Sequence, residues 1–152
     1  MSNRWSAEEL QRIERFFSRL EPGLSTFARS RALTVNRRYH AWPTWDLLFR
    51  HPGGGTGKLE IERVDDETGY LSLCWWKDAY EDGIRFLRTE RWSAEPMPTR
   101  EIVATLDEAL RRVLGWGPTD LQERHGFKDT WQSIPRDVFE SEERRYSLPV
   151  FS

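Results

Sequence analysis

Five segments in the middle of the chain alternate apolar and polar side chains with a period of two, and this pattern limits the fold more than any other feature. The segments cover residues 32–40, 44–50, 58–64, 70–77 and 83–92. Such alternation places successive side chains on opposite faces of a strand, so each segment is predicted to be a half-buried β-strand. Short turn-forming stretches separate the segments, which favours antiparallel pairing in chain order.

Two amphipathic segments flank these strands. Apolar residues recur at helical spacing over residues 7–20, and the Pro22-Gly23 pair is predicted to end this first helix. The same spacing predicts a second helix over residues 99–115, closed by a glycine. Beyond it the pattern weakens. Two shorter helices are predicted over residues 119–125 and 136–146, and the apolar residues 148–151 are expected to dock on the rest of the chain.

The order of these elements predicts an α+β fold. An N-terminal helix precedes a five-stranded, mostly antiparallel meander sheet, and C-terminal helices pack on one face of that sheet. Residues 1–152 are expected to form a single domain, because the length fits one domain and the sequence shows no domain boundary. Small secretion chaperones and some bacterial immunity proteins have a broadly similar element order. That resemblance is one of fold order alone, since no motif matches residue by residue.

The alternation also assigns the two faces of the predicted sheet. One face gathers apolar side chains and is expected to meet the helices: Leu33, Val35, Trp45, Leu47, Phe49, Leu59, Ile61, Leu71, Leu73, Trp75, Ile84 and Phe86. The other face mixes charged and aromatic side chains: Arg38, Asp46, Arg50, Glu60, Glu62, Tyr70, Cys74, Trp76 and Arg85. Two interpretations of this second face stay open. Either it is an exposed binding surface, or the C-terminal segment folds over it as a second core layer.

A glycine-rich stretch at residues 51–58, HPGGGTGK, is similar at first sight to a phosphate-binding loop. That motif needs a glycine at its first position, a hydroxyl after the lysine, and a helix that starts at the loop. Here Pro52 replaces the glycine, Leu59 replaces the hydroxyl residue, and strand-like alternation follows. The run is therefore predicted to be a hairpin connection, with an unusual backbone anion nest as the alternative.

Patterns for metal binding or catalysis are weak in the rest of the chain. The carboxylates at residues 65–67 fit a hairpin turn and lack the alternating oxygen ligands of a calcium loop. The three histidines have no metal-ligand spacing, and Cys74 lies in mid-strand, where an inert thiol is expected. No nucleophile-elbow motif occurs. The sequence thus predicts no metal site, no cofactor and no catalytic residue.

Composition points to a protein of the cytoplasm. No apolar run is long or uninterrupted enough for a signal peptide or a membrane span, and the single cysteine is compatible with a reducing compartment. The net charge is −2, lysines are scarce, and Glu60 and Glu62 lie on the mixed face, which argues against nucleic acid as a partner.

These observations favour a non-enzymatic binding or protein-interaction module. Aromatic and arginine side chains are enriched at binding hot spots, so the candidate binding residues are Arg38, Arg50, Tyr70, Trp76, Asp78 and Arg85. The expected partner is another protein or a second copy of the chain. The alternative is a small-ligand-binding protein or enzyme with a pocket between sheet and helices, where Asp78 or Glu81 acts as acid or base and Arg85 orients an anionic group.

Overall fold

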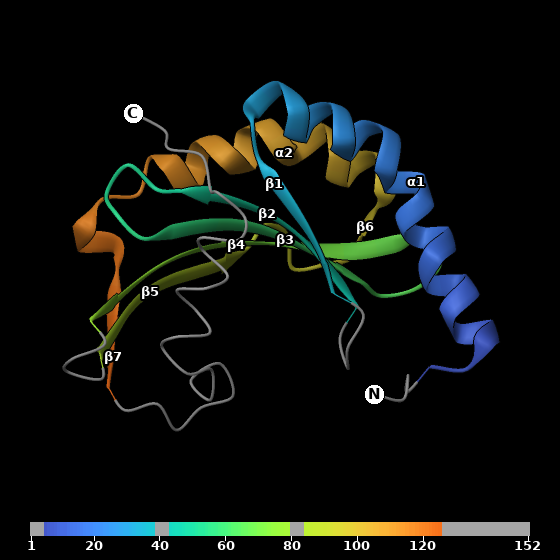
Figure 1. Ribbon diagram of the computed structural model, residues 1–152, viewed down its shortest axis with the longest axis horizontal. Coiled ribbons are helices and arrows are strands. Elements are labelled where there is room, and N and C mark those ends of the chain that lie inside the picture. Colours follow the sequence, from blue (N-terminus) through green and yellow to red (C-terminus); the bar gives the residue numbers. More distant parts are fainter. Residues whose placement is uncertain (1–4, 39–42, 80–83, 126–152) are drawn as a thin grey trace.

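The computed structural model describes residues 5–38, 43–79 and 84–125. Inside the strands, only the backbone is described at residues 38, 78, 79, 84, 85 and 123–125. Two helices lie side by side on one face of a twisted antiparallel sheet (Figure 1). The elements in chain order are α1 (Ala7–Arg31), β1 (Thr34–Arg38), β2 (Thr44–Arg50), β3 (Thr56–Arg63), β4 (Thr68–Ala79), β5 (Ile84–Arg91), β6 (Met97–Pro98), α2 (Thr99–Leu114), the 3-10 turn η2 (Pro118–Asp120) and β7 (Gln122–His125).

The sheet follows the predicted meander. Strands β1 to β5 pair antiparallel with their neighbours in chain order. Strand β7 pairs on the outer side of β5, and the short β6 pairs with one end of β4. The α+β prediction with an N-terminal helix, a five-strand meander and a C-terminal helix on the sheet is confirmed, and β6 and β7 extend the sheet beyond it.

Helix α1 is longer than predicted, because Pro22 and Gly23 do not end it. A proline inside a helix costs about 3 kcal/mol, since its nitrogen has no hydrogen to donate and its ring crowds the preceding turn. Beyond it, however, Leu24 and Ala28 continue the apolar stripe and are buried. Complete burial of a leucine contributes about 1.5 to 3 kcal/mol, and the added turns also gain backbone hydrogen bonds. The prediction that the helix ends at Pro22 considered the local cost of proline. It did not include the burial of Leu24 and Ala28, which offsets that cost.

The glycine of that pair has a packing role. A Cβ atom added at Gly23 would lie 2.6 Å from Cγ1 of Val103 on α2. The two helices thus approach closely where α1 has no side chain. The helix instead ends at Ala32, which has a left-handed backbone with φ 56° and whose N–H donates to the carbonyls of Ala28 and Arg29.

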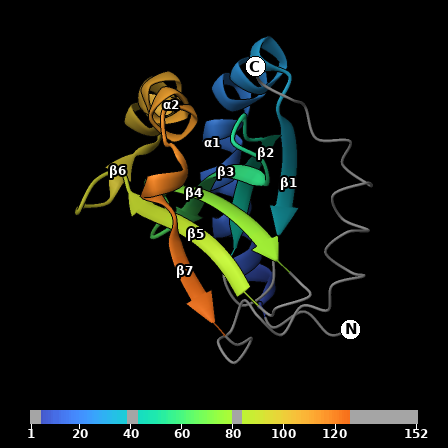
Figure 2. The ribbon, with the colours of Figure 1, turned by 90° about the vertical axis from the view of Figure 1, so that its left-hand side faces the viewer.

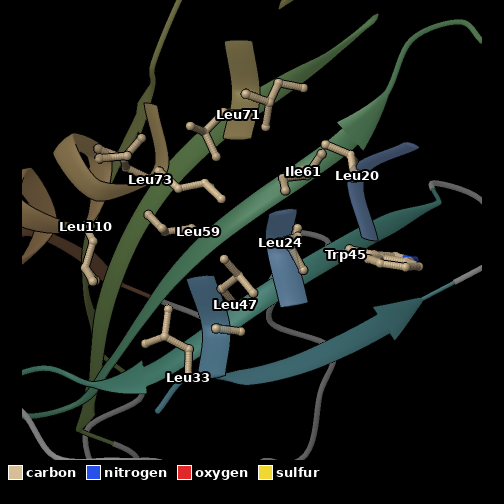
Figure 3. Packing of buried hydrophobic residues seen from close by; sticks show 14 of the residues in the cluster. Leu20, Leu24, Leu33, Trp45, Leu47, Leu59, Ile61, Leu71, Leu73 and Leu110 are labelled. Atoms are coloured by element: carbon tan, nitrogen blue, oxygen red, sulfur yellow. The ribbon is translucent and has the colours of Figure 1, made fainter. Parts of the chain in front are cut away.

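Side chains of the helix-covered face form the core together with the inner faces of α1 and α2 (Figure 3). Within it, Leu47, Leu59, Ile61, Leu71 and Leu73 have no measurable exposure. The predicted core residues with described side chains lie in this layer, with the exception of Phe86. Val35 and Phe86 are only partly buried, and at residue 84 the backbone alone is described.

The predicted helix over residues 119–125 is wrong. Only Pro118–Asp120 form a 3-10 turn, and Gln122–His125 form a strand against β5. Without this strand, β5 would present a row of unpaired N–H and C=O groups, so edge pairing outweighs the local helical tendency. The predicted helix over 136–146 and the apolar residues 148–151 lie outside the described residues.

Candidate functional site

The face of the sheet directed away from both helices is called the helix-free face. Figures 1 and 2 show α1 and α2 on the same side of the sheet, and none of the described helices lies over the other side. Strand alternation and register assign the following residues with described side chains to the helix-free face: Thr34, Asn36, Thr44, Asp46, Leu48, Arg50, Thr56, Lys58, Glu60, Glu62, Tyr70, Ser72, Cys74, Trp76, Leu87, Thr89, Arg91 and Gln122.

The register places all six candidate binding residues at positions of this face, but it does not gather them at one point. Asp78 and Arg85 are Cα partners across β4 and β5. Arg50 and Trp76 both neighbour Thr56 on β3, so they are two strands apart. Arg38 on β1 and Tyr70 on β4 lie in one transverse row, three strands or about 14 Å apart. The six positions are spread over the face, so they do not form one compact ligand-binding site.

The described contacts add Arg91, which the sequence analysis did not include. Its guanidinium carbon lies 3.7 Å from the centroid of the Tyr70 ring. Arg91 is opposite Ser72, one step along from the Glu62–Tyr70 pair, so the contact is diagonal across β4 and β5. Counting the alternation of β5 outward from Arg85 would have placed Arg91 on the correct face. The contact with Tyr70 depends on the pairing register of β4 and β5, which could not be predicted from the sequence.

A charged cluster of Asp46, Lys58 and Glu60 lies at the centre of the helix-free face. The Nζ atom of Lys58 is 2.8 Å from Oε2 of Glu60, and Asp46 is 2 % exposed. Asp46 and Glu60 are directly opposite each other on β2 and β3, an arrangement that is unfavourable for two carboxylates alone. Lys58 therefore brings a positive charge close to this pair of carboxylates.

The surroundings of Lys58 keep its ammonium group charged. Burial alone would lower the pKa of Lys58, but the carboxylates of Asp46 and Glu60, together with the nearby Cys74, outweigh it and raise the pKa above the ordinary value. A lysine nucleophile needs a lowered pKa, so this one is unsuited to that chemistry at neutral pH. Its Nζ also lies 5.6 Å from the ring centroid of Trp76, which makes the lysine part of the same surface.

The glycine-rich stretch is the predicted hairpin connection between β2 and β3. The N–H of His51 donates to the carbonyl of Gly55, closing the loop. Gly54 and Gly55 have φ of 93° and 75°, which glycine adopts without steric cost. A Cβ at Gly55 would lie 2.1 Å from the carbonyl oxygen of Trp76. The backbones of the loop and β4 therefore approach too closely here for any side chain.

The histidine that starts this loop has a structural role. The N–H of Gly53 donates to Nδ1 of His51 at 2.9 Å, so the other ring nitrogen, Nε2, donates to the Val113 carbonyl at 2.6 Å. The ring stacks on Trp75 with centroids 3.8 Å apart, and the Trp75 indole N–H donates to the Gly54 carbonyl. Both ring nitrogens of His51 are occupied in joining the loop to α2, which leaves neither for a ligand.

The acidic turn between β3 and β4 likewise uses its carboxylates locally. Asp65 accepts hydrogen bonds from the N–H groups of Glu67 and Thr68, which lower its pKa. Asp66 accepts from Arg63 at 2.6 Å, and this bond is the main reason that its pKa is lowered. Asp66 also pairs with Arg15 of α1. The turn is the predicted hairpin, and it ties the sheet to the helix.

Comparisons with the profiles of known protein families, with curated protein sequences and with solved structures find no match. Neither of the described helices is long and apolar enough to cross a bilayer. Across residues 5–38, 43–79 and 84–125, no three His, Cys, Asp or Glu side chains group closely enough to hold a metal ion.

Proposed function

We propose that the protein is a non-enzymatic interaction module that binds another protein through the β4–β5 side of the helix-free face. The observation that carries this proposal is the exposure of an aromatic and arginine pair on that side. Tyr70 is partly exposed, Arg91 is exposed, and the two are in contact. Thr89, the next outward residue of β5, is exposed as well.

The stacked pair suits protein recognition. Tyrosine and arginine are enriched among the residues that carry most binding energy. Stacking on the ring orients the Arg91 guanidinium before binding, while its N–H edges can still meet a carboxylate or carbonyl of a partner. Trp76 lies six residues further along β4 on the same face, about 20 Å from Tyr70. Both fit within the patch of about 800 Å² that one partner contributes to a standard interface.

The charges of this face favour a protein partner over nucleic acid. Glu60 and Glu62 lie on β3, beside the proposed contact strands, and Asp46 follows on β2. These carboxylates would repel a phosphate backbone laid across the sheet. A protein surface of low net charge avoids that repulsion and can still place a single acceptor group against Arg91 of the Tyr70–Arg91 pair.

The alternative of a small-ligand pocket between sheet and helices has no specific observation in its favour. Among the described residues, apolar side chains fill that layer, and the buried His51 uses both ring nitrogens. Asp78, expected as the acid or base, and Arg85, expected to orient an anionic group, are Cα partners on β4 and β5. Glu81 lies outside the described residues. A thermal-shift screen with metabolites tests this alternative directly, because a bound ligand raises the melting temperature.

The proposal is tested by affinity capture with the full chain and a double variant, Tyr70→Ala with Arg91→Ala. The wild-type chain should recover a protein in stoichiometric amount, or a second copy of itself. The variant should bind that partner about 30-fold more weakly or worse, as expected for loss of about 2 kcal/mol from a hot spot. Urea unfolding of the variant should confirm that it remains folded.

Arg29→Ala provides the matched control, because Arg29 is an exposed arginine on α1 and therefore on the opposite layer. Its capture yield should equal that of the wild type. Equal binding by the double variant and the wild type would refute the assigned surface. Failure to recover any partner, together with a metabolite that stabilises the chain, would favour the pocket instead.

A further inference from the structure

The outer edge of β5 is only partly paired. Strand β7 pairs with Ile84 to Leu87, so it lies beside the first half of β5 (Figure 2). Within the described part of the chain, residues 88–91 have no partner strand on that side. The residues that precede β7 form the 3-10 turn instead, in which the N–H of Asp120 donates to the carbonyl of Gly117. An open edge of this kind is a template for another extended chain.

The backbone groups of Thr89 and Arg91 face this open edge. The N–H of Trp92 donates to the carbonyl of Leu71 on β4, and successive residues of a strand direct their backbone groups to alternate sides. The N–H and C=O groups of Thr89 and Arg91 therefore point away from β4. No hydrogen bond joins them to another described residue on that side. The side chains of the same two residues are exposed.

On the helix side of this edge, arginine charges are already matched. Arg88 lies over Trp116 and Arg112 lies over Trp92, with guanidinium carbons 5.3 and 4.6 Å from the ring centroids. Glu90 accepts a hydrogen bond from Arg112 at 3.1 Å and lies 3.9 Å from Arg88. One carboxylate thus serves both arginines, and the two tryptophan rings remain partly exposed.

On the helix-free side, Arg91 has a ring but no carboxylate. It stacks on Tyr70, and no carboxylate of the described residues lies within ion-pair distance of its guanidinium. The guanidinium fork matches a carboxylate through two parallel hydrogen bonds. The two sides of the edge therefore favour different groups on a partner, an acidic side chain beside Arg91 and an apolar one beside the tryptophan rings.

We infer that the partner of this surface is an extended acidic segment that pairs with the edge of β5 at Thr89 and Arg91. The inference rests on the interaction surface proposed above and adds the form of the partner. Strand addition of this kind takes affinity from backbone hydrogen bonds and specificity from alternate side chains. Acidic residues on one side of the added strand meet Arg91. Apolar residues on its other side lie beside Trp92 and Trp116.

The first test selects linear peptides from a displayed random library on the immobilised full chain. Enriched peptides should carry Asp or Glu alternating with apolar residues. They should bind Arg91→Glu at least about tenfold more weakly, because their carboxylate then faces a like charge. Arg29→Glu makes the same change of net charge on α1 and should bind as the wild type does. Enriched peptides without carboxylates, or no enriched peptide, would overturn the inference.

The second test asks whether the backbone edge takes part. Thr89→Pro removes the outward N–H and leaves the pairing with β4 intact, because that pairing does not use it. The variant should lose about tenfold more affinity for a selected peptide than Thr89→Val, which changes the same side chain but keeps the N–H. Fluorescence anisotropy with the labelled peptide measures both. Equal losses would show that the peptide does not pair with β5.

Amide hydrogen exchange in the wild-type chain decides the question if Thr89→Pro does not fold. A selected peptide should slow exchange at the amides of Thr89 and Arg91, since both would then donate to the added strand. Unchanged exchange at both amides would refute the strand pairing. If affinity capture still depends on Tyr70 and Arg91 while no peptide protects the edge, the proposed surface stands and the extended partner is refuted.

Discussion

The buried residues on the two faces of the sheet have different kinds of neighbours. On the helix-covered face, Leu59 and Leu73 meet side chains of α1 and α2 and are completely buried. On the helix-free face, Asp46 and Leu48 are also buried, but neighbours of theirs such as Lys58 and Glu60 are polar, and the described helices lie elsewhere. The apolar face needs only water exclusion. The mixed face needs its charges paired as well, as the contact of Lys58 with Glu60 provides.

The largest expected effect compares adjacent tryptophans on opposite faces. Trp75 is completely buried, stacks on His51 and donates to Gly54, so Trp75→Ala should lower the free energy of unfolding by about 3 to 5 kcal/mol. Trp76 is partly buried on the helix-free face, and Trp76→Ala should cost about 1 to 2 kcal/mol. Urea unfolding followed by circular dichroism measures both. Equal losses would show that the faces are equivalent in packing.

Replacing a leucine of α2 tests the helix-covered face from the other side. Leu110 is 3 % exposed and packs with the core, so Leu110→Ala should destabilise the protein by about 2 to 5 kcal/mol. Arg111→Ala, on the exposed side of the same helix, should change stability by less than about 0.5 kcal/mol. A loss under about 1 kcal/mol for Leu110→Ala would contradict the assigned face of α2.

The charged cluster gives the corresponding test for the helix-free face. Lys58→Met removes the ammonium group beside the facing carboxylates of Asp46 and Glu60, and should cost about 2 to 4 kcal/mol. Adding Glu60→Gln to that variant removes one carboxylate and should recover part of the loss. Chemical denaturation of the two variants measures the difference. If the second substitution recovers nothing, the cluster does not carry the energy assigned to it.

The smallest expected effect is a pH dependence from the joint between the hairpin loop and α2. Burial lowers the pKa of His51 from 6.5, the charge of Lys77 acts in the same direction, and the hydrogen bond to Val113 opposes both. Below pH 6.5 the unfolded chain therefore binds more protons at this site than the folded chain does. Stability from His51 is present above about pH 6.5 and is lost as the pH falls through the lowered pKa.

Urea midpoints between pH 8 and pH 5 measure this slope. Over that range Asp65 and Asp66, whose pKa values are lowered from 3.8, stay ionised and add little. His51→Gln should flatten the slope relative to the wild-type chain. An unchanged slope in this variant would mean that another group accounts for the pH dependence.

Several features of the fold could be read from the sequence because they depend on local pattern. Period-two alternation identified the five meander strands and the apolar side of β2 to β4. The glycines of the 51–55 loop and the acidic turn at 65–67 were assigned correctly, since their turn chemistry is local. The same parity placed five of the six candidate residues on one face, whereas Asp78, which was expected in the turn after the fourth strand, lies within β4. Whether they bind a partner stays a prediction.

Other features were decided by contacts between distant parts of the chain. Helix α1 continues through Pro22 because Leu24 and Ala28 find a core to enter, and residues 122–125 form a strand because β5 offers an unpaired edge. The stacking of Arg91 on Tyr70 and the position of Asp46 on β2 opposite Glu60 depend on register. Local pattern fixes which side chains share a face. It does not fix which of them touch, or what covers them, because those depend on the free energy of the whole assembled chain.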